Sequence, residues 1–131
     1  SSVDQSLVDL MPFAQRLGIE LLSTEKDKII AQVTVSKELC TTGAIMHGGA
    51  MMAFADTLGA LGAFMNLPEG KNGTTTIESK TNFLGGAKEG SIVRAECTPI
   101  HVGRRTSVWQ TRLVGEGDKP VALITQTQLV L

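Results

Sequence analysis

The chain has 131 residues, 42% of them hydrophobic, and a formal net charge of −1 at pH 7. This length and apolar content fit one domain, residues 1–131, with a proper core. The near-neutral charge argues against nucleic acid or an anionic membrane as a partner. Two cysteines are too few for a disulfide framework, and nothing in the sequence is typical of a signal peptide. We therefore expect free thiols and a cytoplasmic protein.

The sequence predicts no metal site and no bound cofactor. Its two histidines, His47 and His101, stand alone, and Cys40 and Cys97 lack the spacing of metal ligands.

Residues 1–17 are predicted to form an N-terminal helical segment. From residue 4 the apolar side chains recur at helical spacing, but Pro12 interrupts the pattern, because proline is poorly tolerated inside a helix. We expect a short helix or two turns that end at Gly18 and cover one end of the domain.

Residues 19–24 and 28–35 are predicted to form two strands joined by a charged turn. In the second strand apolar and polar side chains alternate, which is typical of a sheet with one buried face. A loop over residues 36–46 then leads into the central stretch of the chain.

The central stretch, residues 48–67, holds one charged residue, Asp56, among alanine, methionine, leucine, phenylalanine and glycine. This composition and Pro68 beyond it predict a helix from Gly48 to Phe64 or Met65. Apolar residues occur on every side, so we expect the helix to be buried nearly all round. The small residues in the later turns of this helix should let the backbone of a neighbouring segment approach closely. The central acid and the glycines favour a buried helix over a membrane span.

The rest of the chain is predicted to be strands. Residues 74–84 alternate, with Thr76 on the same face as Glu78 and Lys80, and three long candidates follow at 91–102, 104–114 and 121–131. One long antiparallel sheet wrapped around the central helix satisfies this order and supplies the apolar surround that the helix needs. The predicted fold class is α+β.

A carboxylate in such a helix needs partners or a function, since burying an unpaired charge is unfavourable. Asp56 is either a structural residue bonded to its neighbours or the acid of a site. Ahead of it, His47-Gly48-Gly49 places two glycines at the helix entrance, where free N–H groups and the helix dipole favour negative charge. An amide donor and a carboxylate about two turns apart are a plausible pair for acyl transfer.

The layout resembles the hot-dog-fold thioesterases, in particular the PaaI-like branch that hydrolyses acyl-CoA. The family pattern is His-Gly-Gly, six residues, then Asp or Glu and a small or hydroxyl residue, matched here by residues 47–57. Val-Gly-Arg-Arg-Thr at 102–106 is similar to a Gly-Arg-x-Thr segment of this branch. Residues 82–90 are similar to another of its segments, with Gly86 in place of the usual proline. The resemblance spans roughly residues 15–131.

The resemblance implies a catalytic role for Asp56, as nucleophile or as general base toward water. The Gly48 N–H would donate to the thioester oxygen and stabilise the oxyanion, with Gly49 beside it. His47 would orient the turn or contact the substrate, or would simply bond local backbone.

Further substrate contacts are implied at five positions. Thr57 and Thr76 match hydroxyl positions near the acyl group, with Thr76 reaching the site from a partner subunit, or would simply be helix and strand residues. Thr41 stands where relatives carry Asn or Gln, whose longer side chain holds the carbonyl or the water. Arg104 and Arg105 would bind CoA phosphates or would merely be solvated.

The implied assembly is at least a homodimer, with active sites between subunits, and dimers of the family often pair into tetramers. A non-catalytic acyl-CoA binding or sensor protein is the alternative function. A hot-dog dehydratase or hydratase is a further alternative, but the hydratase motif Asp-x-Asn-x-x-His is absent.

Overall fold

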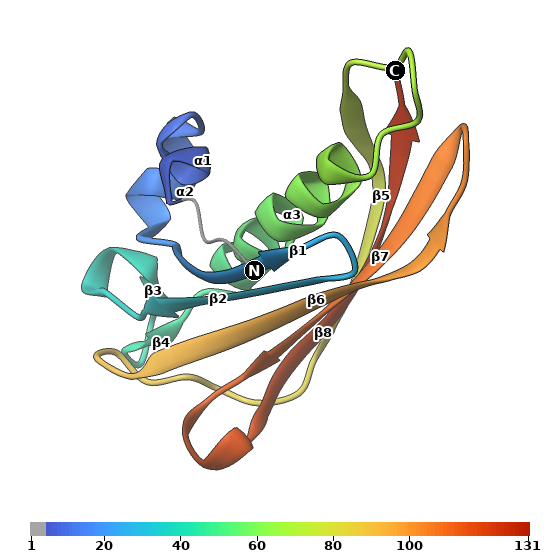
Figure 1. Cartoon of the computed structure of the whole chain (residues 1–131). Coiled ribbons are helices and arrows are strands. Elements are labelled where there is room, and N and C mark those ends of the chain that lie inside the picture. Colours follow the sequence, from blue (N-terminus) through green and yellow to red (C-terminus); the bar gives the residue numbers. More distant parts are fainter. Residues whose placement is uncertain (1–4) are drawn as a thin grey trace.

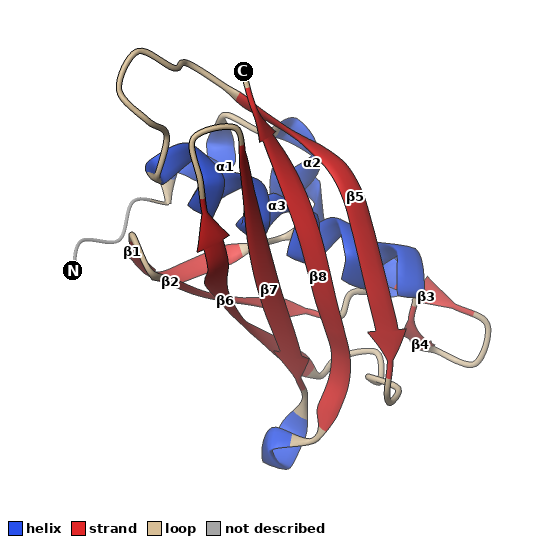
Figure 2. Ribbon diagram, turned by 90° about the vertical axis from the view of Figure 1, so that its right-hand side faces the viewer, coloured by secondary structure: helices blue, strands red, loops and turns tan. Residues whose placement is uncertain are grey.

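A computed structural model describes residues 5–131. These residues form one curved antiparallel sheet that wraps around a long helix, α3 (Gly48–Met65) (Figure 1). In spatial order the strands of the sheet are β1 (Glu20–Glu25), β2 (Lys28–Thr34), β6 (Ile92–Val102), β7 (Thr106–Val114), β8 (Pro120–Val130) and β5 (Thr74–Phe83). The predicted α+β architecture is confirmed, and β5 forms one edge of the sheet (Figure 2).

Two short helices precede the sheet, α1 (Ser6–Asp9) and α2 (Pro12–Leu17). Pro12 is the first residue of α2, where its missing N–H is not needed, so the proline divides the predicted helix into two. Gly18 ends α2 in the left-handed conformation, at φ 75°. Residues 1–4 of the predicted N-terminal segment lie outside the described residues.

The loop before α3 holds structure that the sequence did not predict. A 3₁₀ turn (Lys37–Leu39) leads into a two-stranded hairpin, β3 (Cys40–Thr41) and β4 (Ile45–Met46). The N–H of His47 donates to the carbonyl of Leu39 at 2.7 Å, which fixes the start of α3 against this hairpin. A second 3₁₀ turn (Glu116–Asp118) joins β7 to β8.

The side of α3 that faces the sheet is packed closely at two glycines. A Cβ on Gly62 would lie 2.7 Å from Cζ3 of the buried Trp109, and a Cβ on Gly59 would overlap the side-chain amide of Gln126. The sequence predicted that backbone would approach these thin turns. Large side chains from β7 and β8 approach them instead. By length and composition α3 could cross a membrane, but here it packs along the concave face of the sheet.

One prediction about α3 is wrong: the helix is not buried nearly all round. One side of the helix leaves a stripe that is only half-buried or exposed, made of Gly49, Met52, Ala53, Asp56, Ala60 and Phe64. Part of this stripe borders the edge strand β5, and the sheet does not cover it, so its apolar composition is left for another partner. We call these six residues the open stripe of α3. It carries the one carboxylate of the helix.

A second prediction is wrong in β5, where the alternation changes face within the strand. The pairing with β8 shifts register between Thr76 and Glu78, so that Ile77 is an extra, exposed residue. Such a bulge reverses which face of the strand each later side chain lies on. Thr76 therefore faces α3 together with Ser79, whereas Glu78 is exposed.

Candidate active site

His47 caps α3 with its ring. The Nδ1 atom accepts a hydrogen bond from the N–H of Gly49 at 2.7 Å, and the carbonyl of His47 accepts from Ala50 and Met51. Because Nδ1 is an acceptor, the neutral ring carries its proton on Nε2. The structure thus gives His47 the role of holding the helix entrance.

Steric crowding explains why the two residues after His47 are glycines. A Cβ on Gly49 would lie 2.9 Å from Nδ1 of His47, so a side chain there would push the capping ring away. A Cβ on Gly48 would lie 2.9 Å from Cε1 of Phe83, at the end of β5. The His-Gly-Gly sequence is therefore a compact unit: the ring folds back over one glycine, and the edge strand packs on the other.

The cap leaves one amide unused. Of the four N–H groups from Gly48 to Met51, that of Gly48 is the one without an acceptor within residues 5–131. A free amide at the positive end of an 18-residue helix is suited to binding a negatively charged oxygen.

Asp56 lies half-buried in the middle of the open stripe, with one carboxylate oxygen held. Its Oδ1 accepts from Oγ1 of Thr76 at 2.6 Å and from Nε2 of Gln126 at 3.1 Å. Within the described chain Oδ2 has no donor, so one oxygen is fixed and the other is free. Thr76 comes from the same chain as Asp56. The expectation that Thr76 would reach an acid of the partner subunit does not fit this contact.

Gln126 and Gln128 on β8 are the residues that sequence reasoning missed. Both are completely buried, and they continue the Asp56 contacts into the core: Nε2 of Gln126 donates to Oε1 of Gln128 at 2.9 Å. Oε1 of Gln128 also lies 2.5 Å from Oγ1 of Thr76, and its Nε2 donates to Oγ1 of Thr74 at 3.0 Å. Buried amides on the inner face of a central strand are the signal that could have found them.

A pocket of about 230 Å³ opens beside the acid. Asp56 lines it together with Met52 and Ala53 of α3 and with Thr76 and Ser79 of β5. The Ser79 hydroxyl is buried and has no partner within the described chain. The pocket is smaller than a typical ligand site of ≈300–1,000 Å³.

The other predicted site residues lie outside this pocket. The Thr57 hydroxyl donates to the carbonyl of Ala53 at 2.8 Å, one turn back along α3, as an ordinary helix threonine does. Thr41 is exposed in the hairpin before the helix entrance, and Arg104 and Arg105 are exposed in the turn between β6 and β7. The structure thus brings Thr76 to Asp56 but does not bring the other four together with it.

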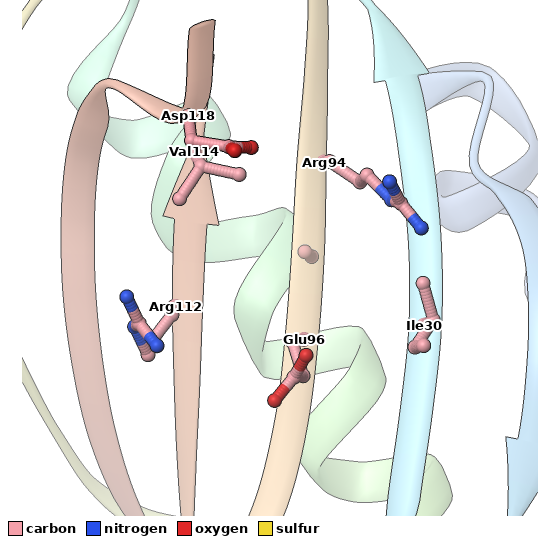
Figure 3. Close-up of a pocket in the computed structure, with 7 residues that line it drawn as sticks. Ile30, Arg94, Glu96, Arg112, Val114 and Asp118 are labelled. Atoms are coloured by element: carbon pink, nitrogen blue, oxygen red, sulfur yellow. The ribbon is translucent and has the colours of Figure 1, made fainter.

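A larger hollow, of about 370 Å³, lies on the outer face of the sheet (Figure 3). Its charged side chains are Arg94, Glu96, Arg112 and Asp118. The sheet separates this hollow from α3, so its two carboxylates lie away from the free amide at the helix entrance. Among residues 5–131 no three His, Cys, Asp or Glu side chains gather as metal ligands.

The family model of the thioesterase superfamily matches residues 43–122, more than half of the chain. The chain belongs to the thioesterase superfamily. It is 28% identical to a 1,4-dihydroxy-2-naphthoyl-CoA hydrolase of Listeria monocytogenes, over 83% of this chain and 87% of that protein. A thioesterase from Haemophilus influenzae has the same fold, with a TM-score of 0.88 and 29% identity over 100% of this chain and 92% of that one.

The fold of this thioesterase is that of the PaaI-like hot-dog proteins. The PaaI protein of Escherichia coli superimposes with a TM-score of 0.86 over 96% of this chain and 88% of that one, at 22% identity. The expected hot-dog thioesterase fold is confirmed, and the chain is a thioester hydrolase. The matched region includes the helix entrance, Asp56 and the strand that holds Thr76.

Proposed function

We propose that this thioesterase hydrolyses acyl-CoA thioesters at Asp56, with the Gly48 N–H as the oxyanion donor. The observation that carries the proposal is the state of the Asp56 carboxylate. Two neutral donors hold its Oδ1, while Oδ2 is free and the group borders a pocket. This arrangement fixes the rotamer of the acid and leaves one oxygen for the reaction.

Two chemical routes use the free oxygen. As a general base, Oδ2 takes a proton from water while the water oxygen bonds to the thioester carbon. The C–S bond then breaks, and the thiolate of CoA leaves and is protonated. As a nucleophile, Oδ2 attacks the carbon itself and forms a mixed anhydride that water hydrolyses. In both routes negative charge develops on the carbonyl oxygen, where the Gly48 amide would stabilise it.

The spacing along α3 determines how these groups combine. Gly48 and Asp56 are eight residues apart, so they stand about 12 Å apart along the helix axis, at 1.5 Å per residue. A reacting carbonyl needs its oxyanion donor and its nucleophile within about 3 Å. The two groups of one chain therefore do not act on the same thioester. We propose that Gly48 of one protomer works with Asp56 of its partner.

The edge strand β5 supplies the surface for such a pair. One side of β5 is paired with β8, while the other side has no strand in the described chain. Unpaired edges favour association. Joining two β5 edges about a two-fold axis would set the two α3 helices antiparallel, with the entrance of each helix toward the middle of the other. We propose a homodimer of this kind, pairing further into a tetramer. A monomer in sedimentation at micromolar concentration would contradict it.

The exposed arginines and the lining of the pocket favour an acyl-CoA as the substrate. Arg104 and Arg105 are exposed in the turn before β7, at the end of the sheet where β5 begins, and there they would bind the phosphates of CoA. The pocket combines the apolar Met52 with the hydroxyls of Thr76 and Ser79. A small or medium acyl group fits such a lining, and the naphthoyl substrate named for the Listeria relative favours an aromatic one.

His47 and Thr41 remain our candidates for contacts at the carbonyl or the attacking water, since both are exposed at the helix entrance. Gly49 and Thr57 contribute through the bonds already described. The proposed reaction is hydrolysis without a cofactor or metal, in the cytoplasm.

The test is thiol release from a panel of short, medium and aromatic acyl-CoAs, run on the wild type and on Asp56→Asn. We expect saturable hydrolysis by the wild type and a loss of about a hundredfold or more in the variant, the scale of one acid–base group. Acyl-CoA binding should be similar in both. Tight binding by both proteins with no release from any substrate would favour the alternative, a non-catalytic acyl-CoA sensor.

A further inference from the structure

The Thr76 hydroxyl lies between two acceptors but has one proton. Its Oγ1 is 2.6 Å from Oδ1 of Asp56 and 2.5 Å from Oε1 of Gln128. A hydroxyl donates one hydrogen bond, so it bonds one of these oxygens at a time. The neighbouring bonds fix the amide of Gln128, because its Oε1 accepts from Gln126 and its Nε2 donates to Thr74. If the Gln128 amide were rotated by 180°, its NH₂ group would face the NH₂ group of Gln126, and two donors would meet.

The preferred acceptor depends on the charge of Asp56. An ionised carboxylate is a stronger acceptor than an amide oxygen, so Thr76 donates to Asp56 while the acid is charged. Once the acid takes up a proton, its oxygens become weaker acceptors, and Oε1 of Gln128 becomes the better partner. The Thr76 hydroxyl can then turn to Gln128 without losing a hydrogen bond.

We propose that Gln128 is a positioning residue of the catalytic site, and that it acts through Thr76 by accepting the hydroxyl when Asp56 becomes neutral. This inference rests on the proposed role of Asp56. It adds that the site is built for an acid that loses its negative charge during the reaction, either by taking a proton from water or by bonding the acyl carbon. No bond is made or broken at Gln128. In the general-base route Asp56 holds the proton lost by the water until it passes to the leaving thiolate or to solvent, and the Thr76 hydroxyl only rotates.

The surroundings of Asp56 leave this arrangement free of competing charges. The side chains that bond its carboxylate, Thr76 from β5 and Gln126 from β8, are neutral. The nearest charged residues of β5, Glu78 and Lys80, are exposed on its outer face. On α3 itself, between Gly48 and Met65, Asp56 is the one titratable residue.

The arrangement predicts opposite shifts for two neighbouring substitutions. Gln128→Met removes the second acceptor, so Thr76 donates to Asp56 in both charge states. The neutral acid is then less favoured than in the wild type, so the NMR midpoint of this variant should lie on the acid side of the wild-type midpoint. Thr76→Val removes the donor to the charged acid, so titration should move to higher pH, whereas Thr76→Ser should behave like the wild type.

The experiment follows the carboxyl carbon of Asp56 by ¹³C NMR as a function of pH, with kcat and KM for acyl-CoA hydrolysis measured over the same range. Gln110→Met is the matched control, since this glutamine lies on the same sheet and bonds Thr125 instead. We expect Gln128→Met to lower the midpoint and kcat with little change in KM. In the Thr76→Val background it should cause no further shift.

Coincident titrations of Gln128→Met and Gln110→Met would overturn the inference, as would a full Gln128 effect in the Thr76→Val background. If Gln128→Met does not fold, Gln128→Leu takes its place, since it also removes the acceptor, and an unchanged midpoint in that variant overturns the inference. Failure of the proposed function gives a different result: the NMR midpoints shift as described, but the wild type hydrolyses no acyl-CoA.

Discussion

The two groups of α3 that we propose to take part in the reaction, the Gly48 N–H and the Asp56 carboxylate, are positioned in different ways. The helix entrance is local, because His47 bonds an amide two residues away and leaves the Gly48 N–H free. The acid is held from a distance, because Asp56 is bonded by Thr76, 20 residues later, and by Gln126, 70 residues later. The oxyanion donor is a backbone group, whereas the acid depends on side chains of three elements.

This difference indicates how each end can fail. The entrance should respond to the loss of the Gly48 amide, to the loss of the His47 cap, and to side chains added at its glycines. The acid should respond to any change that moves β5 or β8 relative to α3, including changes at residues that touch no substrate.

The largest expected effect at the entrance comes from Gly48→Pro. Proline is well accepted as the first helical residue, and His47 already has the extended backbone that proline requires before it. The substitution therefore removes the amide donor and keeps the helix. We expect kcat to fall about 10²–10³-fold, the typical effect of one oxyanion donor. Gly48→Ala is the control, since it adds the same Cβ beside Phe83 but keeps the N–H. Equal losses in both variants would show that crowding, not the donor, matters.

A paired substitution tests whether the acid is held from a distance. Gly59→Ala would crowd the Gln126 amide, and Gly62→Ala would crowd Trp109 on the same face of α3. Both should lower the free energy of unfolding by about 1–3 kcal/mol, as overpacking does. Only Gly59→Ala should also lower kcat of the folded protein, because only Gln126 bonds Asp56. Chemical denaturation and steady-state kinetics measure the two effects, and equal kcat values would contradict the account.

A smaller effect is expected from the cap. His47→Ala should lower the free energy of unfolding by about 1 kcal/mol, the usual contribution of an N-cap side chain. His47→Asn should restore most of it, because asparagine also caps well. If His47→Asn recovers stability but not kcat, the ring has a further contact with the substrate.

The smallest effect should come from Thr57→Val. Its hydroxyl donates to the Ala53 carbonyl on the same helix and is not part of the Asp56 pocket. We expect kcat and KM to change by less than about threefold, well below the loss of an acid–base contact. A tenfold rise in KM would instead place Thr57 at the acyl group.

The sequence was sufficient to predict the fold and the candidate site residues that lie on α3. The apolar stretch before Pro68 and the alternating strands predicted one helix inside one antiparallel sheet. The spacing from His47 to Asp56 indicated the residues that we propose to carry the chemistry. The open stripe could not be foreseen, because an apolar helix face has the same sequence whether the chain or a partner covers it.

The surroundings of the acid could not be predicted, for two reasons. Residues 125–128 are Thr-Gln-Thr-Gln, so both faces of β8 are polar and no alternation shows which pair points inward. In β5 the bulge at Ile77 reverses the faces after Thr76, and the sequence carries no glycine or proline there to indicate it.

The most direct test of a site shared between protomers is to mix two inactive variants. Gly48→Pro and Asp56→Asn chains, each with its own tag, are coexpressed and purified over both tags, and acyl-CoA hydrolysis is measured. If Gly48 of one chain works with Asp56 of the other, each mixed dimer has one site with both defects and one intact site. Activity should then return to about half of the wild type, by the two-fold symmetry of the pair. If the mixed dimers are as inactive as their parents, both groups act within one chain and the central claim is wrong.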